Sequence, residues 1–74
     1  MTFHRLHNGR TGESFLVTAE DPVRLSETIL ARFPEPHWHT VARAQDAALT
    51  LCATTFNPDH ADTALAPLGL TLAR

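Results

Sequence analysis

The sequence predicts a small α+β domain with an antiparallel sheet of four to five strands and two helices on one face. One observation is a repeated pattern, in which a short apolar segment runs into Asp21-Pro22 and again into Asn57-Pro58, each followed by an amphipathic segment. The other is the length of 74 residues, which leaves room for a single domain with one small core. Two such strand-helix units favour the ferredoxin-like order βαββαβ over residues 14–74, preceded by an N-terminal strand and loop over residues 1–13.

The first segment, residues 2–7, is a candidate strand. It ends at Asn8-Gly9, a dipeptide typical of a hairpin turn, and Arg10-Thr11-Gly12-Glu13 extends the loop before the next strand. Its alternation is weak, because Phe3 and Leu6 fall on opposite faces of a strand. A hairpin at this position also conflicts with the ferredoxin-like order, in which the strand beginning at Ser14 already has a neighbour on each side.

A helix is predicted over residues 22–33. Asp21 can accept hydrogen bonds from the free amides of a first turn, and Pro22 at the first helical position loses nothing by lacking an N–H. Apolar side chains recur every three or four residues and form one stripe that includes Leu25, Ile29 and Phe33. Pro34-Glu35-Pro36 then ends the helix and keeps the chain extended.

Residues 37–56 allow two interpretations. As a hairpin, they form two strands around a turn at Gln45-Asp46, and one face of the second strand carries Leu49, Leu51 and Ala53. As a helix, they form an apolar stripe that consists of Val41, Ala44, Ala48, Leu51 and Thr55. The alanine content favours the helix. We favour the hairpin, because residues 50–56 are rich in β-branched side chains and two further strands complete the ferredoxin-like order.

A second helix and a terminal strand complete the pattern. Asn57-Pro58-Asp59 supplies a cap, a first-turn proline and an early negative charge. Ala61 and Leu65 belong to the buried stripe of this helix, which ends before Gly69. We expect residues 70–73 to form a terminal strand, one so short that it matters only if it pairs inside the sheet.

Composition and charge exclude several functional classes. The formal net charge is −2 and all six cationic side chains are arginine, so the broad basic face typical of nucleic-acid binding is missing. No apolar run approaches the roughly 20 residues needed to span a bilayer, and the N-terminal residues do not resemble a secretory signal. A single cysteine fits a reducing compartment. We therefore expect a cytoplasmic protein that binds neither nucleic acid nor membrane.

No group of residues has the pattern of an active site. Cys52 lies in an apolar segment, where a cysteine more often packs as a small hydrophobic side chain than acts as a nucleophile. Asp59 and Asp62 lie at a helix start, where the helix dipole accounts for them. The glycine-rich phosphate-binding motifs are absent. We therefore expect no enzymatic activity and no cofactor.

Five histidines raise the question of a metal site. His37 and His39 would share one face of a strand, and the remaining candidate ligands are scattered along the chain at His4, His7, Cys52 and His60. Closed zinc sites usually take a closely spaced pair of ligands from each of two places, which this spacing does not supply. We therefore expect surface histidines rather than a bound metal.

The best candidate for partner binding is Trp38 with its neighbours His37 and His39, together with Arg43. Tryptophan and arginine are enriched at the centres of protein interfaces, although Trp38 could instead cover the core. The leading hypothesis is a non-enzymatic module with a protein partner, such as a small inhibitor or adaptor of a larger complex encoded by a phage or mobile element. The alternative is a regulatory ligand- or metal-binding domain that acts as a homodimer, since a small sheet exposes edge strands and this chain has no lysine to protect them.

Overall fold

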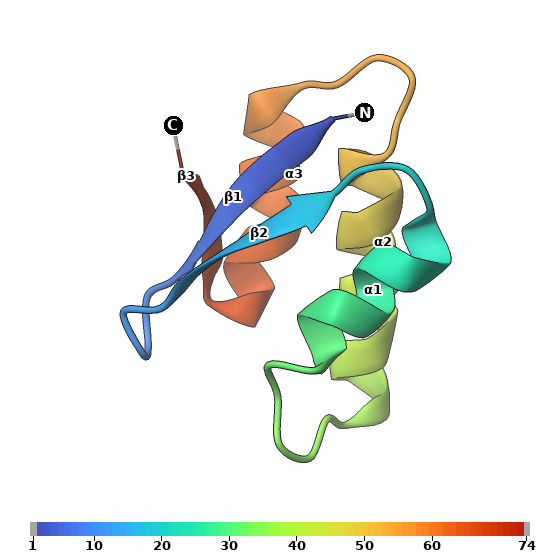
Figure 1. The fold of residues 1–74 in the computed structure, drawn as a ribbon. Helices are drawn as coiled ribbons and strands as arrows, with labels where there is room; N and C mark the ends of the chain where they lie inside the picture. Colours follow the sequence, from blue (N-terminus) through green and yellow to red (C-terminus); the bar gives the residue numbers. More distant parts are fainter. Residues whose placement is uncertain (1, 74) are drawn as a thin grey trace.

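The computed structural model describes residues 2–73, which form a three-stranded sheet packed against helices (Figure 1). In chain order the elements are β1 (Phe3–Asn8), β2 (Ser14–Thr18), α1 (Pro22–Leu30), α2 (Trp38–Leu51), α3 (Pro58–Leu65), the 3-10 turn η1 (Ala66–Leu68) and β3 (Leu70–Ala73). The α+β class and the antiparallel sheet are therefore confirmed. None of the helices in this part of the chain is both long enough and apolar enough to cross a membrane.

Helix α2 replaces the hairpin that the sequence predicted within residues 37–56. That prediction is wrong, and the four to five strands and the ferredoxin-like order that depended on it are not confirmed. The helix forms because it buries a continuous stripe, which consists of Ala44, Ala47, Ala48 and Leu51. Alanine has the highest helix propensity, and its small side chain lets α2 pack closely against both α1 and α3. Leu49 and Leu51, placed on one face by the strand interpretation, separate here: Leu49 is exposed.

Strand β1 is the middle strand of the sheet. It pairs antiparallel with β2, where Leu6 lies opposite Phe15, and with β3, where Leu6 lies opposite Leu72. A hairpin follows β1 as predicted, but its turn spans residues 9–13 and the positive φ falls at Gly12 rather than at Asn8 or Gly9. Its conflict with the ferredoxin-like order disappears because β2 lies at an edge of the sheet. The first and last strands of the described chain are therefore neighbours (Figure 1).

One face of the sheet carries the core and the other faces solvent. Within β2, Phe15 and Val17 are buried, whereas Leu16 between them is exposed. Helix α3 lies behind the sheet in the view of Figure 1. Helix α2 packs against α3, and α1 packs against α2 and contacts β2. The buried apolar residues of the core are Leu6, Phe15, Val17, Leu25, Ile29, Ala44, Ala47, Ala48, Leu51, Ala61, Leu65, Leu68 and Leu70. Every element listed above contributes at least one of them.

The two predicted helix caps are confirmed. Asp21 Oδ1 accepts a hydrogen bond from the backbone N–H two residues on at 3.0 Å, and Asn57 Oδ1 does the same at 2.9 Å. Helix α1 ends at Leu30, earlier than predicted, and Phe33 packs against the core from the following turn, where its N–H donates to the Leu30 carbonyl. Gly69 adopts a left-handed φ of 74°, which glycine tolerates well, and turns the chain into the predicted strand β3.

Candidate binding site at the start of helix α2

Helix α2 starts without the side-chain cap that α1 and α3 have. His37 occupies the N-cap position in an extended conformation, and its side chain makes no capping hydrogen bond. Helical hydrogen bonding begins at Val41, whose N–H donates to the His37 carbonyl at 3.1 Å. Because the first amides of a helix have no intrahelical acceptor, those at the start of α2 face outward with no side-chain acceptor in the described chain.

The four residues predicted to bind a partner lie together at this end of the helix. We call them the α2 start surface, which consists of His37, Trp38, His39 and Arg43. The imidazole rings of His37 and His39 are nearly parallel, with centroids 5.3 Å apart. The indole of Trp38 meets the His39 ring edge-on at 5.6 Å between centroids. Trp38 is 81% exposed, so it does not cover the core.

A cavity of about 480 Å³, which we call the α2 pocket, opens beside this surface. Three of the four predicted residues line it, namely His37, His39 and Arg43. Trp38 is outside the lining. The apolar part of the wall comes from Phe33, in the turn after α1, and from Pro67 and Leu68 of η1. Arg10 reaches the pocket from the turn between β1 and β2, so segments far apart in the sequence meet here.

Arg10 is the cationic lining residue that sequence reasoning missed. Its backbone N–H donates to Asn8 Oδ1 at 2.9 Å, and the Gly9 N–H donates to the Gly69 carbonyl at 3.0 Å. The first bond is local to the β1–β2 turn, and the second ties this turn to the turn before β3. Asn8-Gly9 predicts a turn after β1, but nothing in the sequence predicts that this turn packs against the turn before β3. Only the packing of the two turns brings Arg10 to the pocket.

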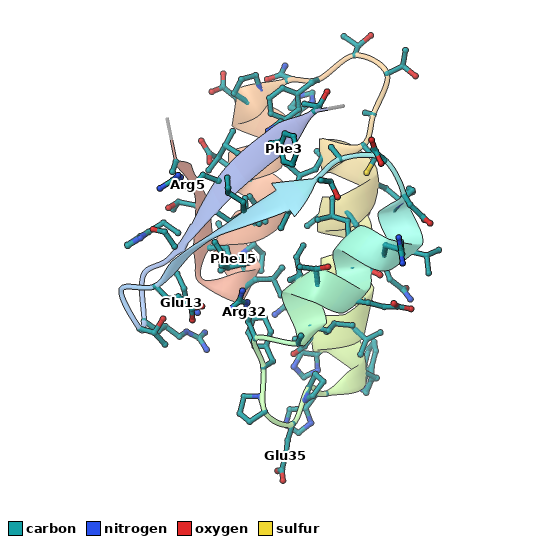
Figure 2. All side chains as sticks on the ribbon, viewed as in Figure 1. Phe3, Arg5, Glu13, Phe15, Arg32 and Glu35 are labelled. Atoms are coloured by element: carbon teal, nitrogen blue, oxygen red, sulfur yellow. The ribbon has the colours of Figure 1, made fainter. Side chains whose placement is uncertain are left out.

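The charged side chains around the pocket differ in their partners. Arg32, outside the pocket, forms an ion pair with Glu13, and its Cζ lies 4.4 Å from the centre of the Phe15 ring. Figure 2 shows these three side chains on the same side of the molecule. By contrast, the guanidinium groups of Arg10 and Arg43 have no ion pair or hydrogen bond to any residue from 2 to 73. The two pocket arginines are therefore available to a ligand.

One carboxylate, that of Glu35, belongs to the pocket lining. Figure 2 shows its side chain at the tip of the loop between α1 and α2, pointing away from the folded chain. No ion pair joins Glu35 to either pocket arginine. At neutral pH the pocket therefore carries two guanidinium groups against one outward-pointing carboxylate, although the chain as a whole has a formal net charge of −2.

The other histidines lie apart from this surface. His4 is on the core face of β1, 4.6 Å from the Phe56 ring, with a buried Nε2 that has no hydrogen-bond partner. Burial lowers the pKa of His4 below its usual value of about 6.5. His7 points to the opposite face and its Nδ1 lies 3.1 Å from Ser14 Oγ. No three metal-ligating side chains gather anywhere within residues 2–73.

Cys52 lies at the opposite end of α2 from the pocket, at the C-cap. It is a free, partly buried thiol. Burial, together with the negative charge of Asp21, raises its pKa. The thiolate is the nucleophilic form of cysteine, so this environment disfavours nucleophilic chemistry at Cys52.

Comparison with known proteins does not assign the chain to a family. Protein-family models, curated protein sequences and solved structures all give no match. The geometry at the start of α2 is therefore the basis on which a function can be proposed.

Proposed function

We propose that this chain is a non-enzymatic protein-binding module, a small inhibitor or adaptor of a larger complex, and that it binds its partner through the α2 start surface. The observation that carries the proposal is the position of Trp38. Its indole is 81% exposed on the first turn of a helix whose other end is anchored in the core. Tryptophan is one of the residue types enriched among those that dominate the energy of protein interfaces.

The surroundings of Trp38 favour a binding role for it. An exposed indole gains little from the fold, whereas burial against a partner removes a large apolar area from water. Its edge contact with the His39 ring limits the orientations of the indole before binding. Ordering a side chain in advance reduces the entropy lost on association. Arg43, one turn further along the helix, adds a charged group of the kind also enriched at interfaces.

The test uses the fact that Trp38 is the single tryptophan of the sequence. Protein labelled with 5-fluorotryptophan gives one ¹⁹F resonance, which we expect to shift and broaden when a partner from an extract of the native host buries the indole. The unlabelled Trp38→Ala variant should fail to compete with the labelled protein. Leu49→Ala is the matched control, because Leu49 is also exposed on α2 but lies outside the α2 start surface. A resonance unchanged by the extract, or equal competition by both variants, would refute the proposal.

The second candidate is a regulatory ligand-binding domain that acts as a homodimer. The α2 pocket favours ligand binding, since its volume of about 480 Å³ falls within the range typical of small-molecule sites. The exposed β2 edge of the sheet favours self-association. Thermal-shift screening against metabolites and metal ions, with sedimentation over a range of protein concentrations, separates this candidate from the first. A monomer that no small ligand stabilises would eliminate it.

A further inference from the structure

We infer that the α2 pocket is an oxyanion subsite, which takes a carboxylate or phosphate group carried by an acidic peptide segment of the protein partner. The inference deepens the proposed function and rests on it. It is carried by two guanidinium groups, those of Arg10 and Arg43, which line one cavity and have no partner of their own within residues 2–73.

The first argument for an oxyanion subsite is that Arg10 and Arg43 reach the same cavity from different elements. Arg10 comes from the β1–β2 turn and Arg43 from the second turn of α2, and the cavity between them is bounded by a third segment, the loop after α1. Guanidinium stays charged at every relevant pH and presents a planar fork of donors that matches the oxygens of carboxylate and phosphate. Two such groups facing one concavity repel each other unless an anion lies between them.

The second argument is the placement of Arg10 before any ligand binds. Its backbone is held by the hydrogen bond to Asn8 Oδ1, and Asn8 itself is buried. Its side chain lies along Gly69, where an added Cβ would be 3.1 Å from Nε and 3.6 Å from Cδ and Cγ. The missing side chain at Gly69 therefore leaves the room that Arg10 occupies. An arginine held in this way loses less conformational entropy on binding than a free surface arginine does.

Neutral donors add to the two guanidinium groups. His37 and His39 line the pocket, and an imidazole ring carries at least one N–H in either protonation state. The uncapped amides of α2 lie at the same end of the helix. These groups can complete the hydrogen bonding of an oxyanion whose charge the arginines balance.

The size and wall of the pocket indicate a side chain rather than a free ion. A volume of about 480 Å³ is much larger than one phosphate group needs, and Phe33, Pro67 and Leu68 offer apolar surface to the methylene groups that carry an acid. Trp38 lies just outside, where it can contact the next residues of the same segment. The α2 pocket would then bind the acidic side chain of the segment while Trp38 contacts an apolar residue next to it.

The test titrates ¹⁵N-labelled protein with inorganic phosphate and, separately, with acetate, each against sodium chloride of matched ionic strength. We expect saturable shifts of the amides at the start of α2 and of the Nε–H groups of Arg10 and Arg43. Arg10→Gln and Arg43→Gln should each weaken binding by roughly tenfold or more, since each removes a hydrogen bond to a charged group. Arg24→Gln is the charge-matched control, because Arg24 is exposed on α1 and should leave binding unchanged.

Shifts that follow ionic strength alone, or binding that survives both pocket substitutions, would overturn the inference. Stronger binding of phosphate than of acetate would indicate a phosphorylated segment, and the reverse an Asp- or Glu-rich one. Both substituted positions are exposed, so the variants should fold, and dispersed amide spectra verify this. If the ¹⁹F signal of Trp38 reports partner binding that Arg10→Gln and Arg43→Gln do not weaken, the proposed function stands and the subsite fails. If phosphate binds but no partner buries Trp38, the proposed function fails and the anion site stands.

Discussion

The two halves of helix α2 differ in almost every physical respect. The second half, together with Ala44 at the middle of the helix, is packed between α1 and α3, and Ala44, Ala47, Ala48 and Leu51 are at most 2% exposed. The first half has no side-chain cap and presents Trp38 to solvent. The buried half fixes where the helix lies, so the exposed half is positioned without having to contribute to stability. One helix can therefore serve the core at one end and a binding surface at the other.

The largest expected effect is in the buried half. Leu51→Ala should lower the free energy of unfolding by about 2–5 kcal/mol, because it removes a fully packed side chain and leaves a cavity. Leu49→Ala, on the same helix but at a side chain that is 59% exposed, should change it by no more than about 0.5 kcal/mol. Urea unfolding of the two variants measures the difference. Equal effects would contradict the division between buried and exposed positions.

A smaller effect is expected from supplying the cap that α2 lacks. His37→Asp should raise the free energy of unfolding by about 0.5–1 kcal/mol, because an aspartate at the N-cap can accept from the free first-turn amides. Asn57→Ala, which removes the existing cap of α3, should lower it by about 1 kcal/mol.

The same His37→Asp variant places a carboxylate at the α2 pocket, so it should weaken phosphate binding while it stabilises the fold. Denaturation and the phosphate titration, run on one sample, read the two effects separately. A variant that gains stability and phosphate affinity together would contradict the division of α2 into a stabilising half and a binding half.

A further effect concerns the pH dependence of stability. Burial lowers the pKa of His4 in the folded chain below the value of about 6.5 in the unfolded chain, so the unfolded chain binds the proton more tightly. The contribution of neutral His4 to the free energy of unfolding is present above pH 6.5, and it is lost as the pH falls through 6.5 toward the lower pKa of His4 in the folded chain. Unfolding curves at several pH values should show this loss in the wild type and less of it in His4→Leu. His7→Gln, on the opposite face of β1, should keep the wild-type dependence.

The smallest effect on stability is expected at Trp38, the centre of the proposed binding surface. Trp38→Ala should change the free energy of unfolding by no more than about 0.5 kcal/mol, because the indole is mostly exposed and alanine is a good helix former. Thermal and urea unfolding measure this directly. A loss of 2 kcal/mol or more, well beyond the range of surface substitutions, would show that Trp38 supports the fold, and the proposed function would lose its main support.

The sequence predicted the elements whose signals are local. Asp21-Pro22 and Asn57-Pro58 each place a cap and a first-turn proline side by side, and both helices start there. Asn8-Gly9 likewise predicted its hairpin. Helix α2 has no such cap, and its residues fit both periods: Leu49 and Leu51 share a face in a strand, whereas Ala44, Ala48 and Leu51 share a face in a helix. What decides between them is burial against α1 and α3, which is a property of the whole fold.

The candidate site divides in the same way. Trp38 and its neighbours could be identified from residue type alone, since an aromatic residue among polar ones is conspicuous in any sequence. Their exposure could not, because the hairpin interpretation gave no helix end on which to place them. The role of Arg10 in lining the pocket could not be predicted from the sequence, for a different reason. Its place in the α2 pocket depends on the contact between Gly9 and Gly69, which lie near opposite ends of the chain.

The central position of β1 has a consequence for how the chain folds. The β1–β2 hairpin and the helices form from contacts that are close in sequence, but β3 pairs with β1, so Arg5 meets Ala73. Contacts between residues so far apart in the sequence are slow to form, because a long loop must close first. During synthesis β1 emerges early and keeps one side unpaired until β3, the last of these elements, has left the ribosome. Throughout that interval the free side of β1 is an edge open to pairing with other chains.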